Sequence, residues 1–193
     1  MLKDTETYHK LIIAAAACFA EKGFSATSVR EISTRAGISQ GAMYTYFKSK
    51  DELIRAIVLE EQNSALEAHD EPYSGSHFER LCKQVASCIS DVGYPVTHHL
   101  WVEIMAESAR NPDLKKTFIS SDKIMRQSIA GIIEKGIAAG EFRRELNPEE
   151  VTIILFAFID GLIARKAINP DFSFSRDVPA FPDLMVKILC QVS

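Results

Sequence analysis

Apolar residues recur at spacings of three and four along most of the chain, as they do on one face of an α-helix. No segment shows the strict alternation of apolar and polar residues that is typical of a half-buried strand. Asparagine–proline pairs at 111–112, 147–148 and 169–170 separate the apolar segments. The pattern therefore predicts an all-α protein. The expected helices cover 29–36, 40–47, 51–68, 76–92, 95–110, 112–139, 148–168 and 181–192.

Between residues 25 and 53 the local chemistry marks each helix boundary. A Ser followed three residues later by Glu is a capping-box pattern that opens a helix, and a Gly after the last helical residue can take the left-handed conformation that ends one. These signals are Ser28 with Glu31, Gly37, Ser39, and Ser49 with Glu52. Two short helices joined by a tight glycine turn are the layout that holds one helix against the major groove of DNA.

The short helix at 40–47 is amphipathic. Met43 and Phe47 share one face, and the opposite face is small and hydroxylic with a cation at its end. That outward face consists of Gly41, Tyr44, Thr45 and Lys48. A solvated helix face that happens to carry an aromatic residue is the alternative interpretation. The turn that precedes the helix favours contact with DNA.

The stretch from Thr27 to Leu53 resembles the DNA-binding domain of TetR-family transcriptional regulators. The family's signature is matched by four segments at fixed spacing, which are 27–32, 36–39, 41–47 and 48–53. The segment at 15–24 is similar to the family's first helix. Tyr46 departs from the histidine that is common at its position, although either side chain can donate to a phosphate. Beyond about residue 55 the chain is similar to the family only in helical organisation and length.

The resemblance implies an N-terminal three-helix helix-turn-helix domain at 1–52 and a C-terminal helical domain for ligand binding and dimerisation at 53–193. It also implies a one-component regulator, most simply a homodimeric repressor that a small molecule releases from a palindromic double-stranded DNA operator. The residues expected to contact DNA are Thr27, Ser28, Ser39, Gln40, Gly41, Tyr44, Thr45, Tyr46, Lys48 and Lys50.

Charge is unevenly distributed along the chain. The formal net charge is −4, yet residues 1–50 carry seven Lys or Arg against four Asp or Glu, and the excess of acidic residues lies in the remainder. Positive charge is thus concentrated where phosphate would be met. The excess is modest, so affinity for DNA is expected to require more than one copy of the domain.

Residues 151–164 are apolar or glycine except for Thr152 and Asp160. The run is too short to span a membrane. A soluble helix that is apolar on every side must be buried on every side, so each of its faces needs a packing partner. The packing partner of one face is most simply a second subunit. This predicts a homodimer through the 148–168 and 181–192 helices. The alternative is a single central helix in a monomer.

A ligand cavity is expected among aromatic, methionine and acidic residues of the C-terminal part. Its candidates are Trp101, Glu103, Met105, Glu107, Phe118, Met125, Phe156 and Asp160. Such a cavity would suit a lipophilic aromatic cation, of the kind sensed by TetR-like regulators of multidrug efflux. Taken singly, each of these residues is also typical of a core or of a solvated face. An anionic metabolite or acyl thioester would instead need basic residues, for which Arg126 and Arg165 are candidates.

Nothing in the sequence predicts an enzyme, a cofactor or a metal site. No nucleophile, phosphate-loop or dinucleotide motif occurs, and the adjacent His98 and His99 point about 100° apart on a helix and cannot chelate one metal. The four cysteines are scattered and suit a reducing cytoplasm, and no membrane segment is expected. A helical protein–protein adaptor is a distant alternative that leaves the 28–50 segment unexplained.

Overall fold

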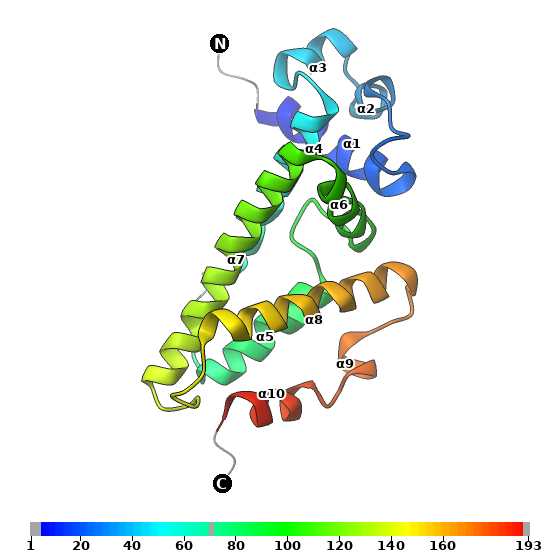
Figure 1. Cartoon of the computed structure of the whole chain (residues 1–193). Coiled ribbons are helices and arrows are strands. Elements are labelled where there is room, and N and C mark those ends of the chain that lie inside the picture. Colours follow the sequence, from blue (N-terminus) through cyan, green and yellow to red (C-terminus); the bar gives the residue numbers. More distant parts are fainter. Residues whose placement is uncertain (1–4, 70–71, 191–193) are drawn as a thin grey trace. The chain divides into compact units, whose positions relative to one another are not determined.

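The computed structural model describes residues 5–69 and 72–190, and within these ranges every regular element is a helix. Figure 1 shows the elements in chain order. They are α1 (Thr5–Lys22), α2 (Val29–Ala36), α3 (Gln40–Tyr46), α4 (Lys50–His69), α5 (His77–Ser90), α6 (His98–Arg110), α7 (Pro112–Ala138), α8 (Pro148–Ile168), α9 (Phe174–Asp177) and α10 (Phe181–Leu189). The predicted all-α class is confirmed.

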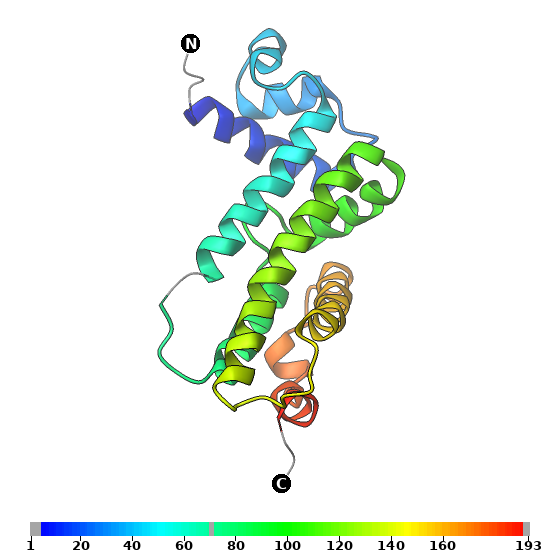
Figure 2. The same cartoon turned by 60° about the vertical axis from the view of Figure 1, so that its left-hand side comes forward.

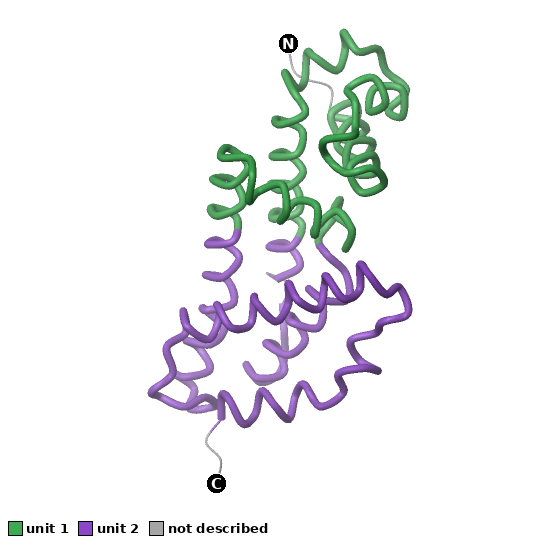
Figure 3. The backbone as a smooth tube through the Cα atoms, turned by 45° about the vertical axis from the view of Figure 1, so that its right-hand side comes forward, with its two compact units in different colours: residues 1–64, 93–121 green, residues 65–92, 122–193 purple. Residues whose placement is uncertain are grey.

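The helices form two compact units, coloured separately in Figure 3. The first comprises Met1–Ser64 and Gly93–Ser121, and the second comprises Ala65–Val92 and Asp122–Ser193. Since α4 and α7 each contribute residues to both units, the division does not follow the predicted boundary after residue 52. In particular, α6 belongs to the same unit as the first three helices.

In the first unit α1 packs against α2 and α6, and α2 packs against α3 (Figures 1 and 2). Its core consists of large apolar side chains with an exposed fraction of 1% or less, each at a position that the apolar periodicity places on an inner face. They are Leu11, Ile12, Phe19, Ile32, Met43, Leu53, Ile54, Ile57, Val58, Leu100, Ile104 and Leu114.

In the second unit α5 packs against α8 and α9. Asn147 caps α8 by accepting hydrogen bonds from the amides of Glu149 and Glu150, and Pro148 occupies its first turn, as predicted. The buried face of α8 carries Val151, Thr152, Leu155, Ile159, Ile163 and Ala167.

Two helix predictions need correction. The helix expected from residue 95 begins at His98, because the side chain of Thr97 accepts the amide of Leu100 and caps the helix there. The last helix ends at Leu189 rather than at 192, and residues 191–193 lie outside the described residues. The short helix α9 was not expected at all.

Candidate nucleic-acid interface

The boundaries of α2 and α3 are fixed by hydrogen bonds of neighbouring residues. Ser28 Oγ accepts the amide of Glu31 at 3.2 Å, and Glu31 Oε2 accepts the amide of Ser28 at 2.8 Å, so the predicted capping box is present. Gly37 ends α2 with φ of 70°, and Ser39 Oγ accepts the amide of Ala42 at 3.1 Å to open α3. The two helices and their turn are thus confirmed in detail.

The second predicted capping box is only half formed. Ser49 Oγ accepts the amide of Glu52 at 3.2 Å, as expected. The Glu52 carboxylate, however, accepts the amide of Lys48 at 2.7 Å instead of that of Ser49. The reciprocal bond is therefore displaced by one residue, and α4 still begins at Lys50.

Helix α3 has the two faces that its sequence predicts. Met43 is fully buried, and Phe47 after the helix is 4% exposed, whereas Tyr44 is 52% exposed. The other exposed residues expected to contact DNA are Ser28, Ser39, Gln40, Gly41, Thr45 and Lys48, while Tyr46 is half-buried. The Thr45 hydroxyl donates to the carbonyl of Ala42 on the same helix. This face combines hydroxyls, an amide, a glycine and a cation, which are groups that can approach a DNA groove.

Most basic side chains around the two helices are engaged within the protein. Arg35 makes a two-pronged ion pair with Glu21 at 2.6 and 2.7 Å, and Lys22 pairs with Glu31. Arg30 and Lys48 are exposed and form no ion pair with any residue that the structure describes. These two side chains are thus the cations best placed to meet phosphate. Arg30 was missed by the sequence analysis, although its position two residues after the Ser28 cap put it on a short helix beside the turn.

Thr27 and Lys50 form hydrogen bonds within the protein, and their contact with DNA stays a prediction. Thr27 is 2% exposed, and its hydroxyl donates to the carbonyls of Gly23 and Cys18. Lys50 Nζ donates to the carbonyls of Phe24 and Thr27 at 2.8 and 2.6 Å. Both polar groups therefore already have partners inside the first unit.

The predicted effector residues divide between the two units. In the first unit Trp101 packs on Phe118 with ring centroids 5.7 Å apart, and Met105 on the same helix is half-buried. Glu103 accepts the amide of Phe24 at 2.6 Å, and the buried Glu107 accepts from Arg110 at 2.9 Å. Both carboxylates expected to face a ligand therefore have partners within the protein.

In the second unit, Met125 is 8% exposed, and Phe156 and Asp160 are half-buried. Within each unit the structure thus places the candidate residues at least partly inside. Whether any of them contacts a ligand stays a prediction.

Glu61 on α4 is a buried acidic residue that the sequence analysis missed. It is 7% exposed, forms no hydrogen bond or ion pair with any described residue, and burial raises the pKa of its carboxyl to about 7. A signal was present in the sequence, since Ile54, Ile57 and Val58 continue to residue 61 at the same helical spacing. An acidic residue on an apolar stripe is an unusual placement.

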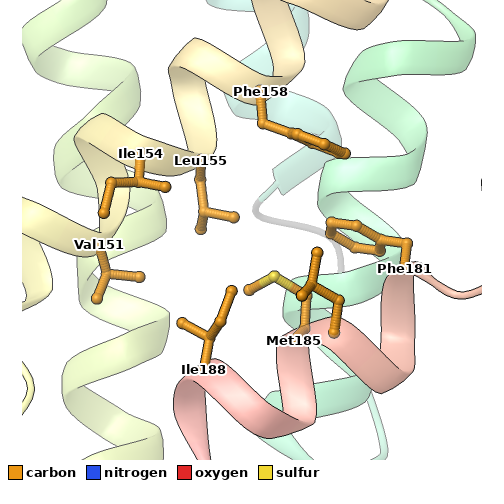
Figure 4. Close-up of a pocket in the computed structure, with 8 residues that line it drawn as sticks. Val151, Ile154, Leu155, Phe158, Phe181, Met185 and Ile188 are labelled. Carbon is orange, nitrogen blue, oxygen red and sulfur yellow. The ribbon is translucent and has the colours of Figure 1, made fainter.

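An apolar groove lies between α8 and α10 in the second unit (Figure 4). Its volume is about 110 Å³, and it is lined by Val151, Ile154, Leu155, Phe158, Phe181, Leu184, Met185 and Ile188. Ile154 is 64% exposed and Leu184 is 48% exposed. Two helices therefore present apolar side chains to the surface in one place.

The described residues contain no helix long and apolar enough to cross a membrane. Over the same part of the chain, no three His, Cys, Asp or Glu side chains are grouped so that they could hold a metal ion.

Comparison with known proteins gives two family matches. Residues 11–57 match the family described as "Bacterial regulatory proteins, tetR family", and residues 79–178 match "BetI-type transcriptional repressor, C-terminal". The HTH-type transcriptional regulator UidR of Escherichia coli (strain K12) is 31% identical over 164 residues, which cover 82% of this chain and 80% of UidR.

Two further relatives agree with this assignment. The HTH-type transcriptional regulator TtgR of Pseudomonas putida is 28% identical over 178 residues, covering 86% of this chain and 82% of TtgR. The structure of Salmonella enterica GusR superposes with a TM-score of 0.82 at 27% identity and covers 98% of each chain. The capped helix pair, the all-helical remainder and these matches together show that the chain belongs to the TetR family of DNA-binding, ligand-responsive transcriptional regulators.

Proposed function

We propose that this protein is a homodimeric repressor that binds a palindromic operator through α3 and leaves it when a small lipophilic ligand binds. The observation that carries the proposal is the exposed polar face of α3, held by Ser39 at its start and by the buried Met43 beneath it. A helix of two turns anchored in this way can enter a major groove with its side chains directed at base edges. We expect it to act in the cytoplasm, where the operator would be met.

The dimer is supported by the groove between α8 and α10. Exposed isoleucine and leucine side chains along two neighbouring helices cost free energy in water and are stabilised when a second copy covers them. Two-fold pairing of these helices gives a four-helix interface, and the same symmetry supplies a second α3 for the other half of a palindrome. The modest positive charge of a single N-terminal segment is a further reason for two copies.

A cationic effector is supported by Glu61. An ionised carboxylate that is buried without a partner is unstable, and a bound cation would supply the missing charge. Glu103 already bonds the Phe24 amide, and Glu107 already bonds Arg110. We therefore expect the acidic side chain that contacts a cation to lie outside α6. Glu61 therefore replaces them as the carboxylate on which the cation hypothesis rests.

An anionic effector is favoured by a different observation. A cavity of about 120 Å³ in the second unit is lined by Arg80 and Lys83 together with Tyr73 and Gln84. No described residue forms an ion pair with either cation, so a carboxylate or phosphate would find positive charge there. Of the two basic residues proposed from the sequence, Arg126 is already paired with Asp122 at 2.9 Å, and Arg165 is exposed.

Selection of duplexes from a random pool, followed by gel shifts at several salt concentrations, tests the DNA-binding proposal. A repressor of this kind should enrich a two-fold symmetric site whose half-sites are about one helical turn apart. Enrichment of no sequence, with binding equal to that of random duplex, would contradict it.

A melting-shift screen then separates the effector classes. Lipophilic cations such as tetraphenylphosphonium should stabilise the wild-type protein and release the selected duplex, and Glu61→Gln should lose this response. A response to carboxylates or acyl thioesters that disappears in Arg80→Gln would favour the anionic class. The DNA-binding proposal is unaffected by either result.

A further inference from the structure

Asn111 lies at the junction of α6 and α7 and uses both halves of its side-chain amide. Its Oδ1 accepts the backbone amides of Asp113 and Leu114, each at 3.1 Å, and so caps α7. Its Nδ2 donates to Oδ1 of Asp51 at 2.6 Å. Because the oxygen faces two backbone donors, the orientation of the amide is fixed, and the NH2 group is the half that meets the carboxylate. A hydrogen bond to a carboxylate is of the strong, charge-assisted kind.

A second asparagine–proline junction shows what capping alone requires. Asn147 also precedes a proline, and its Oδ1 caps α8 by accepting the amides of Glu149 and Glu150. Its Nδ2 donates to no residue that the structure describes. A helix cap thus needs only a side-chain oxygen, which serine or aspartate also supplies. The NH2 group of Asn111 therefore contributes the bond to Asp51 and not the cap.

Asp51 lies in the first turn of α4, a short distance along the chain from α3. Only residues 47–49 separate the two helices. This connection is held in place, since Phe47 is 4% exposed and the Lys48 amide donates to the Glu52 carboxylate at 2.7 Å. A connection so short and so well held transmits a displacement of the first turn of α4 to α3.

A second contact joins the starts of the same two helices. Arg55 lies one turn after Asp51 on α4, and its guanidinium is 3.9 Å from the carboxylate of Asp113 in the first turn of α7. The Asp113 side chain is 64% exposed, so this pair contributes little by itself. The bond from Asn111 is therefore the stronger polar link between α4 and α7.

We propose that Asn111 is a positioning residue for operator recognition, which through Asp51 holds α3 in the place where it reads DNA. The inference rests on the proposed function, in which a homodimer uses α3 to read a palindrome. Its half-sites lie in major grooves one helical turn apart, so tight binding requires the two α3 helices to be held at that separation. Loss of the bond lets α3 move, which lowers affinity for the operator and relaxes the requirement for its spacing.

Exchange of the two side chains tests the bond without a change in net charge. Asn111→Asp keeps an oxygen that caps α7 but places two carboxylates against each other, and should weaken binding to the selected operator about tenfold or more. Addition of Asp51→Asn restores one amide and one carboxylate, with donor and acceptor reversed. The double variant should recover to within about threefold of the wild type. With Asp51→Asn measured alone, additive effects of the two substitutions would overturn the proposal.

An operator with one extra base pair between its half-sites gives a readout that a loss of stability alone does not change. The preference for the correct spacing should be smaller in Asn111→Asp than in the wild type. Asn147→Asp is the matched control, because it makes the same charge change at a capping asparagine in the second unit. It should keep the wild-type affinity and preference. If Asn111→Asp only melted at a lower temperature and kept both quantities, the residue would be structural and the proposal wrong.

Asp51→Ala provides a second test that leaves the cap of α7 intact. It removes a negative charge from the segment that follows α3, so charge alone predicts tighter binding to DNA. Positioning predicts the opposite, a loss of about tenfold in operator affinity. Circular dichroism melts check that the variant is folded, and affinity equal to or above that of the wild type would overturn the proposal. Absence of operator binding by the wild-type protein would instead contradict the proposed function itself.

Discussion

The ring of Phe158 on α8 stacks on that of Phe181 on α10, with centroids 5.6 Å apart and planes inclined by 17°. Phe181 also meets Phe174 of α9 edge-on at 5.2 Å, so one aromatic cluster joins three helices of the second unit. Phe158 and Phe181 of this cluster line one end of the apolar groove in Figure 4, where Ile154 is labelled among the other lining residues. Packed aromatic rings therefore form part of the groove wall, while the isoleucine and leucine side chains at its rim are exposed.

Ile154→Glu is expected to dissociate the proposed dimer. The substitution places a carboxylate in an apolar groove that a second copy would cover, where it would meet its symmetry mate without a counter-charge. Light scattering should show a monomer or a much weaker dimer, and operator affinity should fall with it.

Ile119→Glu is the matched control, because this isoleucine is 58% exposed, compared with 64% for Ile154, and lies in the first unit. The control should remain dimeric and bind the operator as the wild type does. If both variants stayed dimeric at micromolar concentration, the α8–α10 interface would have to be abandoned.

Glu61→Gln is expected to stabilise the protein in a pH-dependent manner. Because burial raises the carboxyl pKa from 4.5 to about 7 in the folded state, the contribution of this group to stability is complete below pH 4.5 and is lost as the pH rises through about 7. The amide has no such penalty, so the variant should gain about 3 kcal/mol at pH 8 and nothing below pH 4.5. Urea denaturation at both pH values measures the difference.

Glu67→Gln, at an exposed position on the same helix, serves as the reference for this experiment. Its free energy of unfolding should follow that of the wild type at each pH. A Glu61→Gln variant that is no more stable at pH 8 would show that the carboxylate has a counter-charge in solution.

Gly37→Ala should destabilise the α2–α3 turn. Gly37 has φ of 70°, and open space surrounds the position where a Cβ would be, so the cost arises from the backbone conformation alone. We expect a loss of about 1–2 kcal/mol in the free energy of unfolding. Gly37→Asn should lose clearly less, since asparagine tolerates the left-handed region. Equal losses in the two variants would point to a cause other than φ.

Exposed residues of α2 and α3 should affect sequence preference and general affinity differently. Gln40→Ala should alter the bases enriched by selection, because an amide can read base edges, whereas Tyr44→Ala should weaken operator binding without unfolding the protein. Arg30→Gln should reduce the salt slope, as expected of a phosphate contact. Circular dichroism melts check that each variant is folded. Unchanged binding in all three variants would mean that the DNA-reading surface lies elsewhere.

The sequence by itself determined most of the helices, the tight turn and the two faces of α3. Ser28, Gly37, Ser39 and Asn147 act on amides or carbonyls within a few residues, and the spacing of Met43 and Phe47 follows from the helical period alone. Such features depend on neighbours along the chain. They can therefore be predicted without knowing how the helices pack.

Only the tertiary structure decided what the charged side chains do. From the sequence we expected Lys50 to contact phosphate and Glu103 to contact the effector. In the structure both bond the backbone of Phe24, which lies 26 residues from Lys50 and 79 residues from Glu103. Glu61 lay on an apolar stripe, but its burial depends on helices brought together from distant parts of the chain. A long polar side chain can reach any group that packing brings near it, so its partner is fixed by the packing of helices and not by local sequence.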